Sequence, residues 1–180
     1  MALHNYASVK GCLPPVAVTD KAGQPLLSWR VLVLPYIEQD SLYRQFHLDE
    51  PWDSPHNIQL IERMPRTYEP FRNKDKFRPG LTFYRSFQGK GTPLTENASL
   101  DEFANGTSNT LLVVEAAEPV PWTKPDEIPY DPQAAVPEIG GLSKMDVRVL
   151  MADGSVHSWD KPLDEMRLRN AILLRPVAVK

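Results

Sequence analysis

The chain has 180 residues, a formal charge of −3 at neutral pH and a hydrophobic fraction of 42%. This composition indicates a folded globular protein and argues against intrinsic disorder. The slightly negative charge gives no electrostatic reason to expect nucleic acid or an anionic membrane surface as a partner. We expect a single domain over residues 1–180, in which 18 prolines impose many turns and extended connections.

One cysteine, Cys12, is present in the whole chain, which excludes an intrachain disulfide and a zinc site built on cysteines. The sequence also lacks an apolar run of the roughly 18 residues that a membrane-spanning helix requires. We therefore expect the chain by itself to be soluble.

The first residues, "MALHNYASVKGCLPP", predict a short helix that begins without a capping residue. Leu3, Tyr6 and Val9 would lie on one helical face. Gly11 and the prolines that follow should end the helix. Because the helix begins in mid-pattern, we expect the natural protein to continue upstream of Met1.

Three short consecutive helices are predicted between residues 28 and 65. Ser28 is a good N-cap for the first helix, which Pro35 should kink or break. Asp40 can cap the second helix. Ser54, followed by a proline in the first turn, can open the third.

Strand signals dominate the second half of the chain. The segment "LTFYRSF", residues 81–87, has the aromatic composition of a strand, and "LLVVEAA", residues 111–117, is the most apolar run and predicts a central strand. Residues 118–141 hold six prolines and predict a long ordered surface loop, pinned by Trp122 and Tyr130.

The segment "DVRVLMADGSVHSW", residues 146–159, gives the strongest local signal. Its alternating apolar residues and the pair Asp153-Gly154 predict a β-hairpin with a two-residue turn. A closing helix should follow Pro162. Helices first and strands later, without an alternating βαβ pattern, predict an α+β fold with short helices packed on an antiparallel β-sheet.

A two-residue turn also fixes which hairpin residues face each other. Met151 would pair with Val156, and both side chains would point into the core. Arg148 would lie opposite Trp159 on the other face, where the two could form a cation–π pair.

The stretch "HLDEPWDSPHN", residues 47–57, is the main candidate for a binding site because carboxylates and imidazoles crowd it. An oxygen-rich subset of these groups would suit Ca²⁺. The candidate metal ligands are Asp49, Glu50, Asp53 and His56. Their spacing matches neither His-Glu-x-x-His nor the calcium-binding loop, so helix capping and solvated turns are the better supported interpretation.

No motif indicates catalysis, and we expect a protein that is not an enzyme. The chain has no Gly-x-Ser-x-Gly elbow and no glycine-rich phosphate loop. A hydrolase that uses paired carboxylates is the weakest alternative, because nothing distinguishes one pair among 23 acids. Trp52 and Trp122 are candidates for stacking a ligand, although large aromatic residues more often anchor a core.

Four stretches together resemble a known family: "ALHNY", "SWRVLVLPYIEQDSLYRQFHLDEPWDSPHN", "NGTSNTLLVVEAAEPVPWTKP" and "VLMADGSV". In these stretches the chain resembles a bacterial prepilin-like, pseudopilin-type family of unknown function, once called putative solute-binding protein family 10. The resemblance implies a pilin-like fold, in which the end of an amino-terminal helix packs on an antiparallel sheet. It also implies a leader and a long hydrophobic helix upstream of residue 1.

The carboxy-terminal motif of that family is incomplete in this chain. The motif is a His, nine residues and Asp-Gly; Asp153-Gly154 is present, but Ser143 stands in the position of the His. Residues 68–73, "YEPFRN", also lack the Cys-Pro that the family usually has there. The role of that His and Cys is therefore not transferred, and Asp153-Gly154 is expected to act as a structural turn.

The resemblance implies the soluble head of a pseudopilin-like protein of the cell envelope, with a structural or interaction role in a secretion- or pilus-type assembly. Its partners would be other envelope or pseudopilus subunits. The missing upstream helix would provide its only membrane contact, and the head by itself would be monomeric. The alternative is a cell-surface module that binds a small ligand or carbohydrate through the 118–141 loop or the turn around Trp52.

Overall fold

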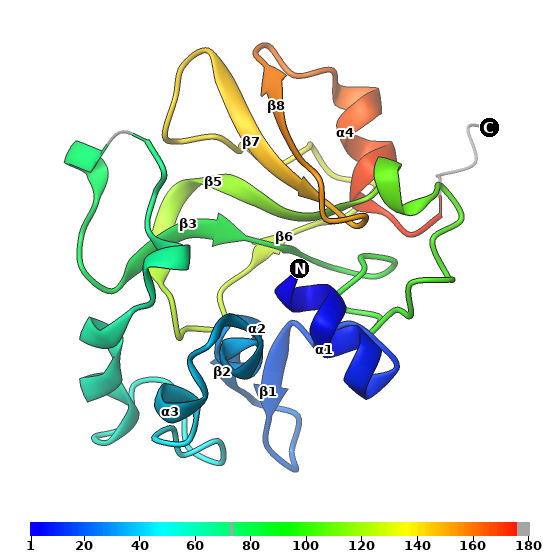
Figure 1. Ribbon diagram of the computed structural model, residues 1–180. Coiled ribbons are helices and arrows are strands. Elements are labelled where there is room, and N and C mark those ends of the chain that lie inside the picture. Colours follow the sequence, from blue (N-terminus) through cyan, green and yellow to red (C-terminus); the bar gives the residue numbers. More distant parts are fainter. Residues whose placement is uncertain (73, 176–180) are drawn as a thin grey trace.

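The protein combines short helices, mainly in its first half, with strands that dominate its second half (Figure 1). The computed structural model describes residues 1–72 and 74–175. In chain order the elements are α1 (Ala2–Lys10), β1 (Ala17–Thr19), β2 (Pro25–Ser28), α2 (Trp29–Leu32), η1 (Leu34–Ile37), α3 (Asp40–Tyr43), η2 (Asn57–Arg63), η3 (Arg66–Tyr68), η4 (Lys74–Lys76), β3 (Leu81–Arg85), β4 (Phe87–Gln88), η5 (Thr107–Asn109), β5 (Leu111–Pro121), β6 (Ile128–Pro129), β7 (Asp146–Met151), β8 (Val156–Asp160) and α4 (Glu165–Ile172), where η denotes a 3₁₀ helix. Within the described residues, no helix has the length and apolar character needed to cross a membrane.

A four-stranded antiparallel sheet with the order β3-β5-β7-β8 forms the centre of the molecule (Figure 1). Strand β5 lies between β3 and β7, as its apolar sequence predicts, and it extends to Pro121, beyond the predicted residues 111–117. The pair β1-β2 is antiparallel, and the two-residue pair β4-β6 is parallel. The predicted α+β class with a main antiparallel sheet is confirmed.

The two faces of this sheet carry different layers. The alternating burial of β7 shows the division, because side chains of a strand point to opposite faces in turn. On one face Val147, Val149 and Met151 form a core cluster with the apolar residues of α4. On the other face Leu150 lies among residues of α1, α2 and η1.

Helix α1 joins the core through a narrower apolar stripe than its sequence pattern predicts. Leu3 and Ala7, one helical turn apart, are buried, whereas Val9 is 68% exposed. Gly11 ends the helix, as expected, with a φ of +80° that a residue with a Cβ rarely adopts.

The first predicted helix of the 28–65 segment is confirmed, with its break. The Ser28 hydroxyl accepts a hydrogen bond from the backbone N–H of Arg30 at 3.3 Å and so caps α2. The helix ends at Leu32, and Pro35 lies in the separate 3₁₀ helix η1. Removing one backbone donor at this proline is enough to interrupt a short helix.

The other two helices of this segment begin differently from the prediction. Asp40 does not cap α3; it is the first residue of that helix, and its carboxylate accepts from Arg44 Nε at 2.7 Å. The third helix is the 3₁₀ helix η2, which begins at Asn57. Ser54 still supplies a capping oxygen, because its hydroxyl accepts from the backbone N–H of Asn57 at 3.0 Å.

The β7-β8 hairpin is shifted by one residue from the predicted register. Leu150, not Met151, faces Val156, because the turn has three residues, Ala152 to Gly154. A three-residue hairpin loop needs a left-handed residue at its end, and Gly154 has a φ of +88°. The shift places Val156 on the α1 side of the sheet, where it is 61% exposed, so its predicted core position is wrong.

The shift also separates the predicted cation–π pair. Arg148 faces Ser158, and its guanidinium lies over the Phe71 ring, 4.5 Å from the ring centroid. Trp159 is on the opposite face, where the guanidinium of Arg167 from α4 lies 4.1 Å from its ring centroid.

Residues 118–141 form an anchored connection rather than a plain surface loop. Trp122 and Tyr130 are buried, as predicted for residues that pin this segment. Ile128 pairs with Phe87 in the short β4-β6 ladder. The predicted loop therefore begins after β5 and is divided by β6.

A fully buried ion pair ties this connection to α2. Arg30 lies 2.9 Å from the Glu127 carboxylate, and both side chains are inaccessible to solvent. The same guanidinium donates to three backbone carbonyls at 2.9–3.0 Å, those of Tyr84, Trp122 and Lys124. A buried charge is tolerated when hydrogen bonds and an opposite charge replace water, as they do here.

Candidate functional site: an apolar groove beside a charged network

An open groove of about 490 Å³ lies between α1, the α2-η1 segment and the sheet. Its helical wall includes Leu3, Trp29 and Val33, and its sheet wall includes Leu112 and Leu150. These residues belong to, or pack against, one core cluster, so the groove is a part of the core that opens to solvent.

Three large apolar side chains at the groove are exposed: Met1, Phe71 and Val156. Val156 lies opposite Leu150 in the hairpin, so the shifted register adds an apolar residue to this face of the sheet. Exposed apolar side chains gathered around a concave surface are typical of binding sites rather than of ordinary surface.

One end of the groove is closed by a contact between α1 and the β7-β8 turn. His4 Nε2 donates to the backbone carbonyl of Ala152 at 2.6 Å. The Asp153 side chain stabilises the turn itself by accepting from the backbone N–H of Ser155 at 2.8 Å. The turn that contains Asp153 and Gly154 thus lies against the first helix.

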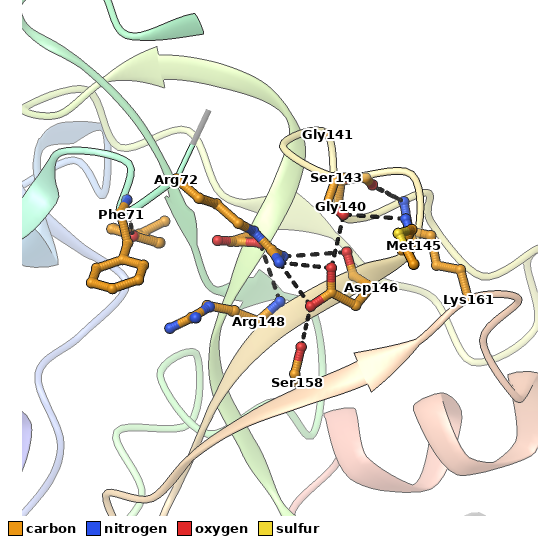
Figure 2. Close-up of polar contacts among 12 residues, drawn as sticks. Phe71, Arg72, Gly140, Gly141, Ser143, Met145, Asp146, Arg148, Ser158 and Lys161 are labelled. Atoms are coloured by element: carbon orange, nitrogen blue, oxygen red, sulfur yellow. Dashed lines mark hydrogen bonds and ion pairs between the residues drawn. The ribbon is translucent and has the colours of Figure 1, made fainter. Parts of the chain in front are cut away.

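The other end of the groove borders a charged network on the same face of the sheet (Figure 2). Glu115 of β5 and Asp146 of β7 are its acids, and Arg72 reaches them from the segment before β3. The guanidinium of Arg72 donates to both Asp146 oxygens at 2.6 and 2.7 Å and to Glu115 Oε2 at 2.8 Å. Two acids are therefore held by one arginine.

Hydroxyl groups complete the environment of Asp146. Ser158 donates to its Oδ2, and Ser143, at the position where the family resemblance expects a His, donates to its Oδ1 at 2.8 Å. The hydrogen bonds from Arg72, Ser158 and Ser143 hold the pKa of Asp146 far below its ordinary value. Asp146 is therefore a stable anion rather than a proton donor or acceptor near neutral pH.

The side chain of Arg148 points in a different direction from that of Arg72. Its backbone N–H donates to Glu115 Oε2 at 3.2 Å, but its side chain extends away from Asp146 toward Phe71 and lines the groove (Figure 2). Its Nε is buried without a hydrogen-bond partner. Within the described residues its guanidinium forms no ion pair, so its terminal N–H groups have no acidic partner at the groove, although the charges of Arg72 and Arg148 together balance those of Glu115 and Asp146.

Asn57 organises the predicted metal-binding stretch. Its side-chain amide is buried and donates to the backbone carbonyls of His47, Glu50 and Pro51 at 2.9–3.2 Å. Its Oδ1 accepts from the backbone N–H of His47 at 3.0 Å. This buried amide holds the loop closed, and sequence analysis did not identify it because an asparagine ten residues away gives no local signal.

The acids and histidines of this stretch mostly contact one another or the backbone. The rings of His47 and His56 stack with centroids 3.6 Å apart, and His47 Nδ1 lies 2.9 Å from Glu50 Oε1. Hydrogen bonds from Ser54 and His47 lower the pKa of Glu50. In the part of the chain that the structure describes, no three His, Cys, Asp or Glu side chains gather as a metal site would require. The Ca²⁺ site built from Asp49, Glu50, Asp53 and His56 stays a prediction.

The two candidate tryptophans lie away from the groove. Trp122 is fully buried, stacks with Tyr68 at 5.6 Å and donates from Nε1 to the Ile61 carbonyl at 3.0 Å. Trp52 is half-buried, and Lys124 Nζ lies 5.9 Å from its ring centroid. Trp122 thus serves as a core anchor in this structure, while a ligand-stacking role for Trp52 stays a prediction.

The groove residues themselves carried no motif. Arg148 and Val156 come from the two strands of one hairpin and lie on the same face only because of its register, and Phe71 joins them from a distant segment. One weak signal existed in the sequence: Phe71 is a large apolar residue next to a run of charged ones, "RNKDK".

Residues 1–99 match the sequence profile of SBP_bac_10, a protein family of unknown function (DUF1559). The chain belongs to this family. The matched span includes the helical wall of the groove and β3, whereas β5, β7 and β8 lie beyond it. No curated protein and no solved structure matches the chain.

Proposed function

We propose that the chain is the non-enzymatic head of a pseudopilin-like protein of the cell envelope, with a structural or interaction role in a secretion- or pilus-type assembly. The observation that carries this proposal is the position of α1. In this first helix Leu3 and Ala7 are buried in the core cluster that also holds Leu112 and Val113 of β5, and the amino end of the helix is exposed, with Met1 84% accessible. A pilin-like subunit requires this arrangement, because its upstream helix must enter the head without crossing the core.

The contact between His4 and Ala152 supports the same proposal. It fixes the amino end of α1 to the β7-β8 turn and so sets the direction in which an upstream helix would leave the head. The stretches "ALHNY" and "VLMADGSV", which carry the family resemblance, meet at this contact. The proposed partners are other envelope or pseudopilus subunits, and membrane attachment would come through the upstream helix alone.

Cell fractionation of the full-length gene product tests this proposal. We expect a tagged product to be processed, to sediment with membranes, and to expose its head to protease added to intact cells or spheroplasts on the outer side of the cytoplasmic membrane. A matched variant that begins at Met1 should stay in the cytosol. Recovery of the unprocessed full-length product in the cytosol would overturn the envelope assignment.

A second function, a small-ligand module, is favoured by a specific observation. The groove is mainly apolar and contains one positively charged side chain, Arg148, that has no ion-pair partner among the described residues. Carbohydrates need many polar partners, so the groove suits an apolar ligand better than a sugar.

A further inference from the structure

We propose that the groove between α1 and the sheet binds an amphipathic carboxylate, a molecule with a linear apolar body and one carboxylate that pairs with Arg148. This inference rests on the second function proposed above and names its ligand class. It does not depend on the location of the protein in the cell.

The size and lining of the groove call for an apolar body. Its volume of about 490 Å³ falls within the range of roughly 300–1,000 Å³ that is typical of small-molecule sites. The walls come from Leu112 and Leu150 on the sheet and from Trp29 and Val33 on the helical side. Burying an alkyl chain against such walls is favourable by about 0.8 kcal/mol for each methylene group.

The charge at one end of the groove selects the head group. Arg148 is the only charged side chain among the lining residues that the structure describes. Arg72 donates to both Asp146 and Glu115, and neither carboxylate forms an ion pair with the guanidinium of Arg148 among the described residues. The α-amino group of Met1 and the His4 ring lie at the other end, beside the β7-β8 turn.

Arg148 is held in place before any ligand arrives. Its backbone N–H is fixed by Glu115, and its guanidinium lies over the Phe71 ring at 4.5 Å. A planar guanidinium with free donors matches a carboxylate in two parallel hydrogen bonds. Because the group is already ordered, little conformational entropy is lost when the carboxylate binds.

Titration calorimetry with octanoate, decanoate and dodecanoate, each below its micelle concentration, tests the ligand class. Affinity should rise about fourfold for each added methylene until the groove is filled. Decan-1-ol and decyltrimethylammonium are the matched controls for head-group charge. Both should bind at least tenfold more weakly than decanoate, and the fluorescence of Trp29 in the groove wall should respond to decanoate.

Two sets of variants test the residues. Arg148→Gln keeps the backbone bond to Glu115 and should weaken decanoate binding at least tenfold, which equals about 1.4 kcal/mol. Arg167→Gln, which removes another arginine stacked on an aromatic ring outside the groove, should leave binding unchanged. At the exposed rim, Val156→Asp should weaken binding and Val156→Lys should strengthen it.

Three results would overturn the proposal: no binding of any of the three acids, equal binding of decanoate and decan-1-ol, or an Arg148→Gln variant that binds decanoate like the wild type. Sedimentation of the same samples tests whether a second copy of the chain occupies the groove instead. A dimer that decanoate dissociates would identify a second copy of the chain as the natural occupant and would also overturn the proposal. The Val156 variants keep the test decisive if Arg148→Gln fails to fold. None of these results bears on the fractionation experiment, so the two proposals fail separately.

Discussion

Arg30 and Arg148 each have a guanidinium near an aromatic ring, at 5.2 Å from the Trp29 centroid and 4.5 Å from the Phe71 centroid, but their surroundings differ. Arg30 is fully buried, pairs with Glu127 and donates to three backbone carbonyls. Arg148 is half-buried, and its guanidinium contacts Phe71 at the edge of an open groove, with no ion pair among the described residues. The first arginine therefore holds distant segments together, whereas the guanidinium of the second has no hydrogen-bond partner among the described residues.

Because their surroundings differ, we expect substitution of the two arginines to affect different properties of the protein. Loss of a saturated buried charge leaves its partners buried without hydrogen bonds, which destabilises the fold. Loss of an unsaturated charge at a groove removes recognition and leaves few partners behind. Substitution of Arg30 should therefore lower stability strongly, whereas substitution of Arg148 should mainly weaken ligand binding and change stability little.

The largest expected effect is that of Arg30→Met on stability. The change leaves the Glu127 carboxylate buried without its counter-charge and three carbonyls without a donor. The free energy of unfolding in urea should fall by about 3–5 kcal/mol. The control is Arg44→Met, which removes an arginine from the exposed pair with Asp40 and should change stability by less than about 0.5 kcal/mol. Equal effects of the two changes would contradict the central role of Arg30.

The acid sensitivity of the network beside the groove should depend on Asp146. Because hydrogen bonds from Arg72, Ser158 and Ser143 lower the pKa of this carboxyl in the folded state, its ionised form stabilises the fold at neutral pH. That contribution is present above the unfolded-state pKa of about 3.9 and is lost as the pH falls below it. Urea unfolding of the wild type and Asp146→Asn should differ at pH 7, and the difference should shrink as the pH falls from about 5 to 2.

A partial change provides the control for this pH dependence. Ser143→Ala removes one of the three donor side chains and should reproduce part of the effect of Asp146→Asn, with the same pH dependence. A difference between wild type and Asp146→Asn that stayed constant from neutral to acidic pH would show that packing, and not the carboxylate charge, accounts for it.

Features encoded by neighbouring residues were predictable from sequence. Ser28 caps α2, Pro35 separates η1 from it, and the apolar run of β5 lies inside the sheet, because each depends on local backbone chemistry or on simple hydrophobicity. The hairpin of residues 146–159 was predicted in kind but not in register. Ala152 donates its backbone N–H to the Thr110 carbonyl at 2.7 Å, a tertiary bond that draws Ala152 into the turn.

The candidate site itself was not predictable from sequence. Val156 lines the groove beside Arg148 because of the shifted register, and Phe71 joins them from a segment with no regular pattern. The partners of Arg30 lie up to 97 residues along the chain, so its burial could not be inferred from the apolar segment "SWRVLVL". Local sequence signals identified the helices and strands, whereas contacts between distant segments determined the positions of the charged side chains.

The contrast between the two arginines is sharpened by measuring the stability of Arg148→Gln. The guanidinium makes no hydrogen bond among the described residues, so the main loss is the cation–π contact with Phe71. The free energy of unfolding should fall by less than about 1 kcal/mol. A loss as large as that of Arg30→Met would mean that Arg148 supports the fold and would remove the reason to regard it as free for a ligand.

The smallest expected effect is that of Ca²⁺ on thermal stability. In the loop of residues 47–57, Asn57 already satisfies the backbone carbonyls of His47 and Glu50, and the Glu50 carboxylate lies against the His47 ring. These contacts favour the structural interpretation of the loop, so addition of Ca²⁺ should leave the melting temperature unchanged, as should Asp53→Ala in the presence of Ca²⁺.

If Ca²⁺ did bind in this loop, the change in melting temperature would be easy to detect. A ligand at about ten times its Kd stabilises the folded state by roughly 1.4 kcal/mol, which corresponds to a rise of several degrees for a chain of this size. A rise of that size with Ca²⁺ that Asp53→Ala abolishes would establish the metal site. It would also show that this loop, with its exposed acids, binds a ligand, as proposed for Arg148 at the groove.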